Sequence, residues 1–164
     1  SRRQRQMCIR DRCGSTFGIR GGNAMILNKL LLKSFGKFQN REIVLKEGIN
    51  VVYGENESGK STMHTFLRAM FFGLRRMRGK ASRTDTYTRY KPWGENARYE
   101  GILWFTCGEK RFRLERDFSV PQSPATLFCE TDGELLSVAD GDLDMLLGNI
   151  SETCLLYTSD AADD

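Results

Sequence analysis

Apolar positions along the chain form short runs typical of β-strands and one spaced stripe typical of an α-helix. The run at 26–32 predicts a buried strand, and the β-branched and aromatic residues at 49–53 predict another. Residues 41–45 alternate between polar and apolar positions, which predicts a strand with one buried face. Between 63 and 74, apolar side chains recur at i, i+3, i+4, i+7, i+8 and i+11, so we expect a helix that Gly73 ends.

The second half of the chain has the pattern of a β-meander. A hairpin is expected at 98–117, with its turn at 108–109, and a third strand is expected at 125–130. Apolar spacing in 143–150 predicts a short helix. Residues 75–92 are polar and basic, and they predict a long mobile loop. These patterns favour an α/β fold with a substantial antiparallel part.

Composition limits the class of protein. The chain has 164 residues, of which 40% are hydrophobic and 28% charged, and this suits one globular domain. No apolar run approaches the roughly 18 residues that a membrane span needs, so no membrane partner is expected. The formal net charge of +4 is mild and does not by itself indicate nucleic acid. Five cysteines without a CxxC pair, and a single histidine, argue against a zinc site.

Both ends of the chain resemble translated library DNA. One DNA strand that encodes residues 1–12 has a reverse complement that encodes residues 154–164. Two unrelated ends of a gene should not be antisense copies of one short DNA sequence. This DNA sequence resembles the transposon end used to fragment DNA for sequencing, and segments translated from it are excluded from fold reasoning.

Excluding these ends from the native sequence divides the chain into three expected segments. We expect 1–24 to be a non-native adapter-derived and upstream segment, 25–153 to be the native part, and 154–164 to be an adapter-derived tail. The native part would then be an N-terminal fragment of a longer protein. It keeps only Cys107 and Cys129, which fits a reduced, cytoplasmic protein.

Residues 54–61, GENESGKS, match the phosphate-binding pattern GxxxxGK[ST]. The pattern lies between a predicted strand and a predicted amphipathic helix, which is the context that it needs. Glycine lets the backbone curl, the curled N–H groups of 57–61 form a nest for anionic oxygens, and the start of the helix adds its positive dipole end. The candidate nucleotide-binding residues of this loop are Gly54, Asn56, Glu57, Ser58, Gly59, Lys60, Ser61 and Thr62.

The chemistry expected of this loop is the binding of ATP with Mg²⁺. Lys60 is the candidate catalytic residue, because its ammonium group reaches the β- and γ-phosphates. The Ser61 hydroxyl is the candidate magnesium ligand, and Thr62 adds a contact toward the α-phosphate. A phosphate loop alone does not choose between a kinase, a GTPase and an ATPase.

The segment 30–62, with two predicted strands before the phosphate loop, resembles the N-terminal half of the ABC-type ATPase head of SMC-like proteins. SbcC, RecN and RecF are relatives of this kind, and the sequence is most similar to bacterial YhaN-like AAA-family ATPases. The resemblance covers 25–153 and is most specific over 33–62. It implies an α/β fold of the P-loop NTPase type, in which this chain is the N-terminal lobe of a head with an antiparallel β-meander.

The resemblance also implies site residues and partners. The turn at 33–38 would lie near the nucleotide base, which adds Lys33 and Ser34 to the candidate site. The Q-loop, signature motif, Walker B aspartate, catalytic glutamate and switch histidine of the family would lie outside the chain. The expected partners are ATP, the missing C-terminal half of the same head, a second head in a dimer, and DNA. The parent protein would couple ATP hydrolysis to DNA repair or chromosome maintenance.

Two other functions stay open at this point. A small-molecule or nucleoside kinase would need an acceptor pocket and a lid after the helix, and the predicted β-meander argues against them. The other alternative is a non-catalytic P-loop scaffold head of a coiled-coil protein. If the chain hydrolysed ATP alone, the candidate carboxylates would be Glu115, Asp117 or Glu130 on the meander strands.

Several weaker features have ordinary structural interpretations. The basic run in 75–92, with Tyr87 and Tyr90 interleaved, could bind DNA phosphates, but such runs are more often solvated. His64 lies off the apolar stripe of the helix and favours a structural or solvated role. Tryptophans 93 and 104 are more often core or anchoring residues than platforms for bases.

Overall fold

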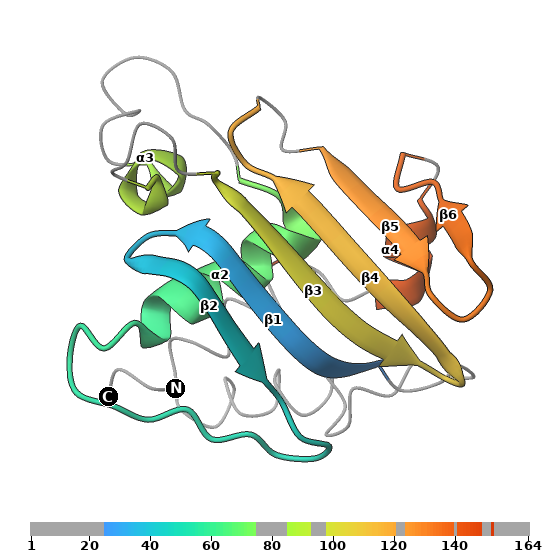
Figure 1. Ribbon diagram of the computed structural model, residues 1–164, viewed down its shortest axis with the longest axis horizontal. Helices are drawn as coiled ribbons and strands as arrows, with labels where there is room; N and C mark the ends of the chain where they lie inside the picture. Colours follow the sequence, from blue (N-terminus) through green and yellow to red (C-terminus); the bar gives the residue numbers. More distant parts are fainter. Residues whose placement is uncertain are drawn as a thin grey trace, which may run out of the picture.

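A computed structural model describes residues 25–74, 85–92, 98–120, 124–139, 141–148 and 152. The expected adapter-derived ends lie outside these residues. Figure 1 shows a single twisted sheet, with α2 (Lys60–Phe72) and α4 (Asp142–Leu147) behind it and α3 (Thr86–Tyr90) beyond one end. Within the described part of the chain, no helix is long and apolar enough to cross a membrane.

The sheet has six strands in the order β2-β1-β3-β4-β5-β6, and every neighbouring pair is antiparallel. The last four strands are consecutive in the chain, so the predicted β-meander is confirmed, and the fold class is mixed α/β as expected. The strands are β1 (Met25–Phe35), β2 (Phe38–Val44), β3 (Glu100–Cys107), β4 (Lys110–Asp117), β5 (Ala125–Cys129) and β6 (Glu134–Leu136).

The first strand is longer than the apolar run that predicted it. It continues to Phe35, so the turn that was expected over 33–38 consists only of Gly36 and Lys37. The two faces of β1 differ, because alternate side chains of a strand point to opposite sides. Leu30 and Leu32 are fully buried on the α2 side, and Lys29 lies against Trp104 on the other.

The helix α2 follows its predicted apolar stripe. Phe66, Ala69 and Met70 are fully buried against the sheet, and the Gly73 N–H closes the helix by donating to the Ala69 carbonyl at 2.8 Å. Gly101 of β3 makes the close approach possible: a Cβ added there would lie 2.2 Å from the Phe66 ring. The apolar stripe therefore fixes α2 against the sheet, and the first residue of this helix is Lys60 of the candidate site.

Part of the predicted loop at 75–92 is helical, which corrects that prediction. The short helix α3 begins after Asp85, whose carboxylate accepts a hydrogen bond from the Thr88 N–H at 2.8 Å. Tyr87 is buried against Tyr99, with ring centroids 5.6 Å apart. The contact with Tyr99, just before β3, helps to hold this segment, and its polar composition did not indicate that contact. Residues 75–84 lie outside the described part.

The strand predicted at 49–53 is wrong. These residues have no regular structure in the described part, and Ile49 is 94% and Tyr53 90% exposed. The segment is held locally by Asn50, whose side chain bonds the N–H and the carbonyl of Lys46 at 2.9 and 2.7 Å. A strand needs a neighbour to pair with, and β-propensity mainly measures fit to such a neighbour. None of the described strands pairs with this segment.

Candidate functional site

The phosphate loop at 54–59 joins the irregular segment to α2, along the β2 side of the sheet in Figure 1. It contains a turn in which the Ser58 N–H donates to the Glu55 carbonyl at 3.1 Å. Glu57 has a φ of 64° and Gly59 a φ of 110°, so the backbone curls through the left-handed region twice within three residues. The curl expected from the motif is therefore present.

The two motif glycines stand where a side chain would collide. A Cβ added at Gly54 would lie 2.7 Å from the Ser58 hydroxyl oxygen. A Cβ added at Gly59 would lie 2.4 Å from the Phe38 ring and 2.8 Å from Cε of Lys37. Gly59 is strongly favoured by its φ of 110° and by the Phe38 ring beside it, whereas the atom nearest to Gly54 is the end of the short Ser58 side chain.

The ammonium group of Lys60 lies on the carbonyl side of the loop. It donates to the Gly54 carbonyl and, at 2.9 Å, to the Glu55 carbonyl. Both acceptors are uncharged carbonyl oxygens, so neither contact pairs this ammonium group with a carboxylate. A cation placed this way suits an anionic ligand in the same loop.

The N-terminus of α2 also fits a phosphate group. It has neither a side chain that caps its N–H groups nor an acidic residue in its first turn. The first N–H groups of a helix lack partners within the helix, and the helix dipole places partial positive charge there. This donor set, with the Lys60 ammonium beside it, is suited to the phosphates of a nucleotide. The Ser61 side chain is exposed in the same turn, where its hydroxyl could ligate Mg²⁺.

The other predicted site residues divide into two groups. Asn56, Glu57 and Ser58 are exposed on the loop, and Thr62 is half-buried at the start of α2, where its methyl group lies beside Gly36. Ser34 is buried in β1. Lys33 forms an ion pair with Glu100 at 2.9 Å on the sheet face opposite α2, so the structure does not bring its ammonium group to the loop.

The candidate carboxylates of the meander have partners of their own. Glu115 pairs with Arg113 at 2.8 Å, and Glu130 lies 3.3 Å from the same guanidinium. Asp117 accepts hydrogen bonds from the N–H and the hydroxyl of Ser119. Alternation along the strands places Glu115 on the face opposite α2. The structure does not bring these three carboxylates to the phosphate loop.

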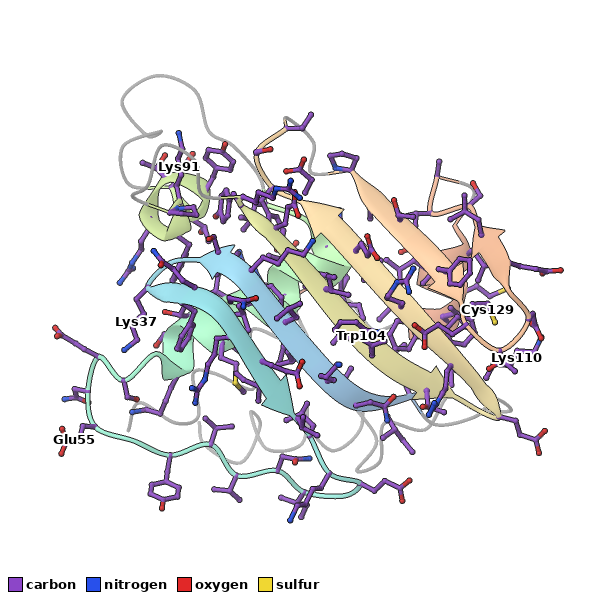
Figure 2. All side chains as sticks on the ribbon, in the orientation of Figure 1. Lys37, Glu55, Lys91, Trp104, Lys110 and Cys129 are labelled. Atoms are coloured by element: carbon purple, nitrogen blue, oxygen red, sulfur yellow. The ribbon has the colours of Figure 1, made fainter. Side chains whose placement is uncertain are left out.

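That opposite face carries a hollow of about 320 Å³ around Trp104. Trp104 is labelled on the near side of the sheet in Figure 2, where the Lys29 ammonium lies 4.2 Å from the indole centroid. The indole N–H donates to Glu130 at 3.3 Å. The contacts of Trp104 therefore favour the anchoring role expected for it.

The sequence analysis expected the turn at 33–38 near the nucleotide through a resemblance, but it did not predict the contacts that this turn makes. The Lys37 ammonium donates to the Glu57 carbonyl, and the Gly36 N–H donates to the Tyr90 carbonyl of α3 at 2.7 Å. These contacts join residues that are 20 or more positions apart, so no local periodicity marks them. The contact of Phe38 with Gly59, which leaves no room for a side chain there, likewise joins residues that are 20 or more positions apart.

Comparison with known proteins gives one family match. Residues 25–87, less than half of the chain, match the model of a family described as AAA domain. The matched segment contains β1, β2, the phosphate loop and α2. It is similar to an AAA domain over that range.

One solved structure of low identity is also similar. It comes from work on the structural biochemistry of ATP-driven dimerization and DNA-stimulated activation of SMC ATPases. The TM-score is 0.46 and the sequence identity 17%, with 85% of this chain and 84% of that chain covered. No curated protein matches the sequence.

Proposed function

We propose that this chain is the ATP-binding, N-terminal part of an SMC-like ATPase head, with residues 25–153 as its native part. The observation that carries the proposal is the loop at 54–59 closing onto an uncapped helix start, with Lys60 held on its carbonyls. The match of residues 25–87 to the AAA domain family supports it. The proposed place of action is the cytoplasm.

In this proposal each residue of the loop has a binding task. Lys60 leaves the carbonyls of Gly54 and Glu55 and contacts the β- and γ-phosphates, because a charged phosphate oxygen is a better acceptor than a carbonyl. The free N–H groups at the start of α2 bind phosphate oxygens, and Thr62 lies toward the α-phosphate. Mg²⁺, when bound with the nucleotide, supplies charge neutralisation at the phosphates, and the Ser61 hydroxyl is its ligand from this chain.

We infer that the chain binds ATP without hydrolysing it. Hydrolysis needs a group that orients the attacking water at the γ-phosphate. The carboxylates of Glu115, Asp117 and Glu130 are engaged in contacts on the strands of the meander. The groups for hydrolysis would come from the missing half of the head and from a second head.

The exposed segment at 49–53 supports the proposal that a further part of the head packs here. Ile49, Val51 and Tyr53 are 79% to 94% exposed, and they lead directly into the loop. Apolar side chains gathered in this way are typical of a covered surface. We propose that the C-terminal half of the head pairs with this segment.

We also propose that the parent protein acts in DNA repair or chromosome maintenance.

The test is titration of the full chain with a fluorescent ATP analogue in the presence of Mg²⁺. The wild-type chain should bind weakly, and Lys60→Ala should reduce binding below detection. Lys46→Ala is the matched control, because Lys46 is an exposed lysine of the preceding segment and should leave the affinity unchanged. Equal affinity of wild type and Lys60→Ala would contradict the proposed function. Phosphate release that depends on Lys60 would contradict the inference that hydrolysis needs a further part.

A further inference from the structure

We propose that Lys37 is a second phosphate-binding cation of this site, and that Phe38 positions it and the loop; the proposal rests on the proposed binding of ATP. Lys37 belongs to the short turn between β1 and β2, and Phe38 is the first residue of β2. Both are distant in sequence from the phosphate loop. The ligand group is the terminal phosphate of a nucleoside triphosphate.

The first argument is the contact that Lys37 makes. Its ammonium group donates to the carbonyl of Glu57, in the middle of the phosphate loop. Figure 2 shows Lys37 at the turn end of β1 and β2, on the side of the sheet where the loop with Glu55 runs. Lys60 approaches the carbonyls of the same loop, at Gly54 and Glu55. Two ammonium groups from different elements therefore lie on one short stretch of backbone.

The second argument concerns charge. The acceptors of both ammonium groups are neutral carbonyl oxygens, and the ion pairs of the described residues include neither lysine. Lysines 29, 33 and 110, by contrast, each pair with a carboxylate. Two like charges that share one loop repel each other, and a multiply charged anion between them removes the repulsion. Exchange of a carbonyl acceptor for a phosphate oxygen also strengthens each hydrogen bond.

The third argument is that the backbone of the turn is fixed. Gly36, with a φ of 56°, donates its N–H to the Tyr90 carbonyl, and Tyr90 stacks on Phe35 with centroids 5.5 Å apart. A Cβ at Gly36 would lie 3.0 Å from the Thr62 methyl group and 3.1 Å from the Tyr90 ring. The turn is thus held between α3 and the first turn of α2. A side chain on a fixed backbone reaches its ligand with less loss of entropy.

Phe38 completes the arrangement from the other side of the turn. Its ring fills the space beside Gly59 that a side chain there would occupy. The Lys37 ammonium lies 5.7 Å from the centroid of the same ring. Phe38 therefore keeps the turn and the start of α2 at a separation that the Lys37 side chain can span to reach the loop. It is a positioning residue, because it acts through Gly59 and Lys37.

The test uses the full chain and three probes: ATP with Mg²⁺, AMP, and inorganic tripolyphosphate. Lys37→Met should weaken binding of ATP and of tripolyphosphate about tenfold, as expected for a lost charged hydrogen bond, and leave binding of AMP unchanged. Lys37→Arg should restore most of the affinity, since it keeps the charge. Lys46→Met is the control for a general loss of positive charge. Phe38→Ala should weaken ATP binding, and Phe38→Leu should recover part of it.

A second measurement needs no ligand. Hydrogen exchange of the backbone amides at 57–62 should be faster in Lys37→Met and in Phe38→Ala than in wild type, while amides of β3 and β4 keep their rates. Wild-type ATP affinity in Lys37→Met, or equal loss in Lys37→Met and Lys37→Arg, would overturn the phosphate role. Unchanged exchange in both variants would overturn the bracing of the loop. A wild-type chain that binds no ATP would overturn the proposed function and the phosphate role together, and the exchange rates would then decide the bracing alone.

Discussion

The guanidinium of Arg116 on β4 donates a hydrogen bond from Nε to the carbonyl oxygen of Met70 at 2.9 Å. A second bond runs from Nη2 to the Phe71 carbonyl at 3.3 Å, so the cation caps the last turn of α2. Burial lowers the pKa of Arg116 to about 10, and the group remains charged at neutral pH. A positive charge at this end complements the helix dipole, whose other end carries the phosphate loop.

Loss of Arg116 should destabilise the fold. Arg116→Met leaves buried carbonyl oxygens without their donor, which costs about 1–3 kcal/mol for such a group. Urea unfolding followed by circular dichroism measures the change. Arg41→Met is the matched control, because Arg41 is exposed on β2, and it should change stability by less than about 0.5 kcal/mol. An Arg116→Met variant as stable as the control would refute the capping role.

Substitution of Gly101 should disturb the packing of α2. In Gly101→Ala the new methyl group would lie 2.2 Å from the Phe66 ring and 2.9 Å from the Met70 sulfur. Overpacking of this kind costs about 1–3 kcal/mol. The double variant Gly101→Ala/Phe66→Leu should recover part of that loss, because the smaller side chain makes room. Thermal melts of the four members of this cycle give the coupling, and strictly additive effects would show that the two positions do not touch.

The pair of Lys110 and Asp132 should give a visible titration shift. The Lys110 ammonium, 2.6 Å from the carboxylate, lowers the pKa of Asp132 below its ordinary value of 3.8. A lowered folded-state pKa means that the stabilisation is present above pH 3.8 and is lost as pH falls through the folded-state value. NMR titration of the Asp132 carboxyl group checks this. Lys110→Met should raise that pKa, and Lys46→Met should leave it in place.

Removal of the two expected adapter-derived ends should leave the domain intact. A chain limited to 25–153 should keep the melting temperature and the ATP affinity of the full chain, because residues 1–12 are mainly polar and charged and have little to bury. Scanning calorimetry and nucleotide titration of both chains measure these quantities. A decrease of several degrees on trimming would mean that an end packs against the domain.

The exposed apolar segment should tolerate polar substitutions. Ile49→Ser and Val51→Ser should change stability by less than about 0.5 kcal/mol, because both side chains face water in this chain. Leu30→Ala, at a fully buried position of β1, should instead cost about 2–5 kcal/mol. Chemical unfolding of the three variants gives the comparison. A large loss at Ile49 would place that side chain inside the domain.

The elements that were predicted correctly are those whose structure is determined by the pattern of residues within the element itself. The stripe of α2 and the hairpin of β3 and β4 are determined by spacing within one segment, and both are present. The strand expected at 49–53 depends on a pairing partner, and the described part has none for it. The helix α3 depends on the contact of Tyr87 with Tyr99, which no local pattern announces.

The candidate site shows the same division. The loop from Gly54 to Thr62 was predictable because glycine, lysine and serine occur at the fixed spacing of the phosphate-binding motif. This spacing is what places them around a phosphate group. Lys33 was included through a resemblance, and its pairing with Glu100 across the sheet lies outside any local pattern. Lys37 was not singled out, because its contact with Glu57 exists only after the β1–β2 turn has met the loop.

The position of β1 between β2 and β3 has a consequence for biosynthesis. Leu30 pairs with Leu103, although the phosphate loop and α2 are translated between them. At roughly 5–20 residues per second, the ribosome needs about 4–15 seconds to make the intervening chain. During that interval the β1–β2 hairpin emerges with one side unpaired and its apolar face bare, which is a state that chaperones recognise. Residues of β3, which are made after α2, thus supply part of the surface against which α2 packs.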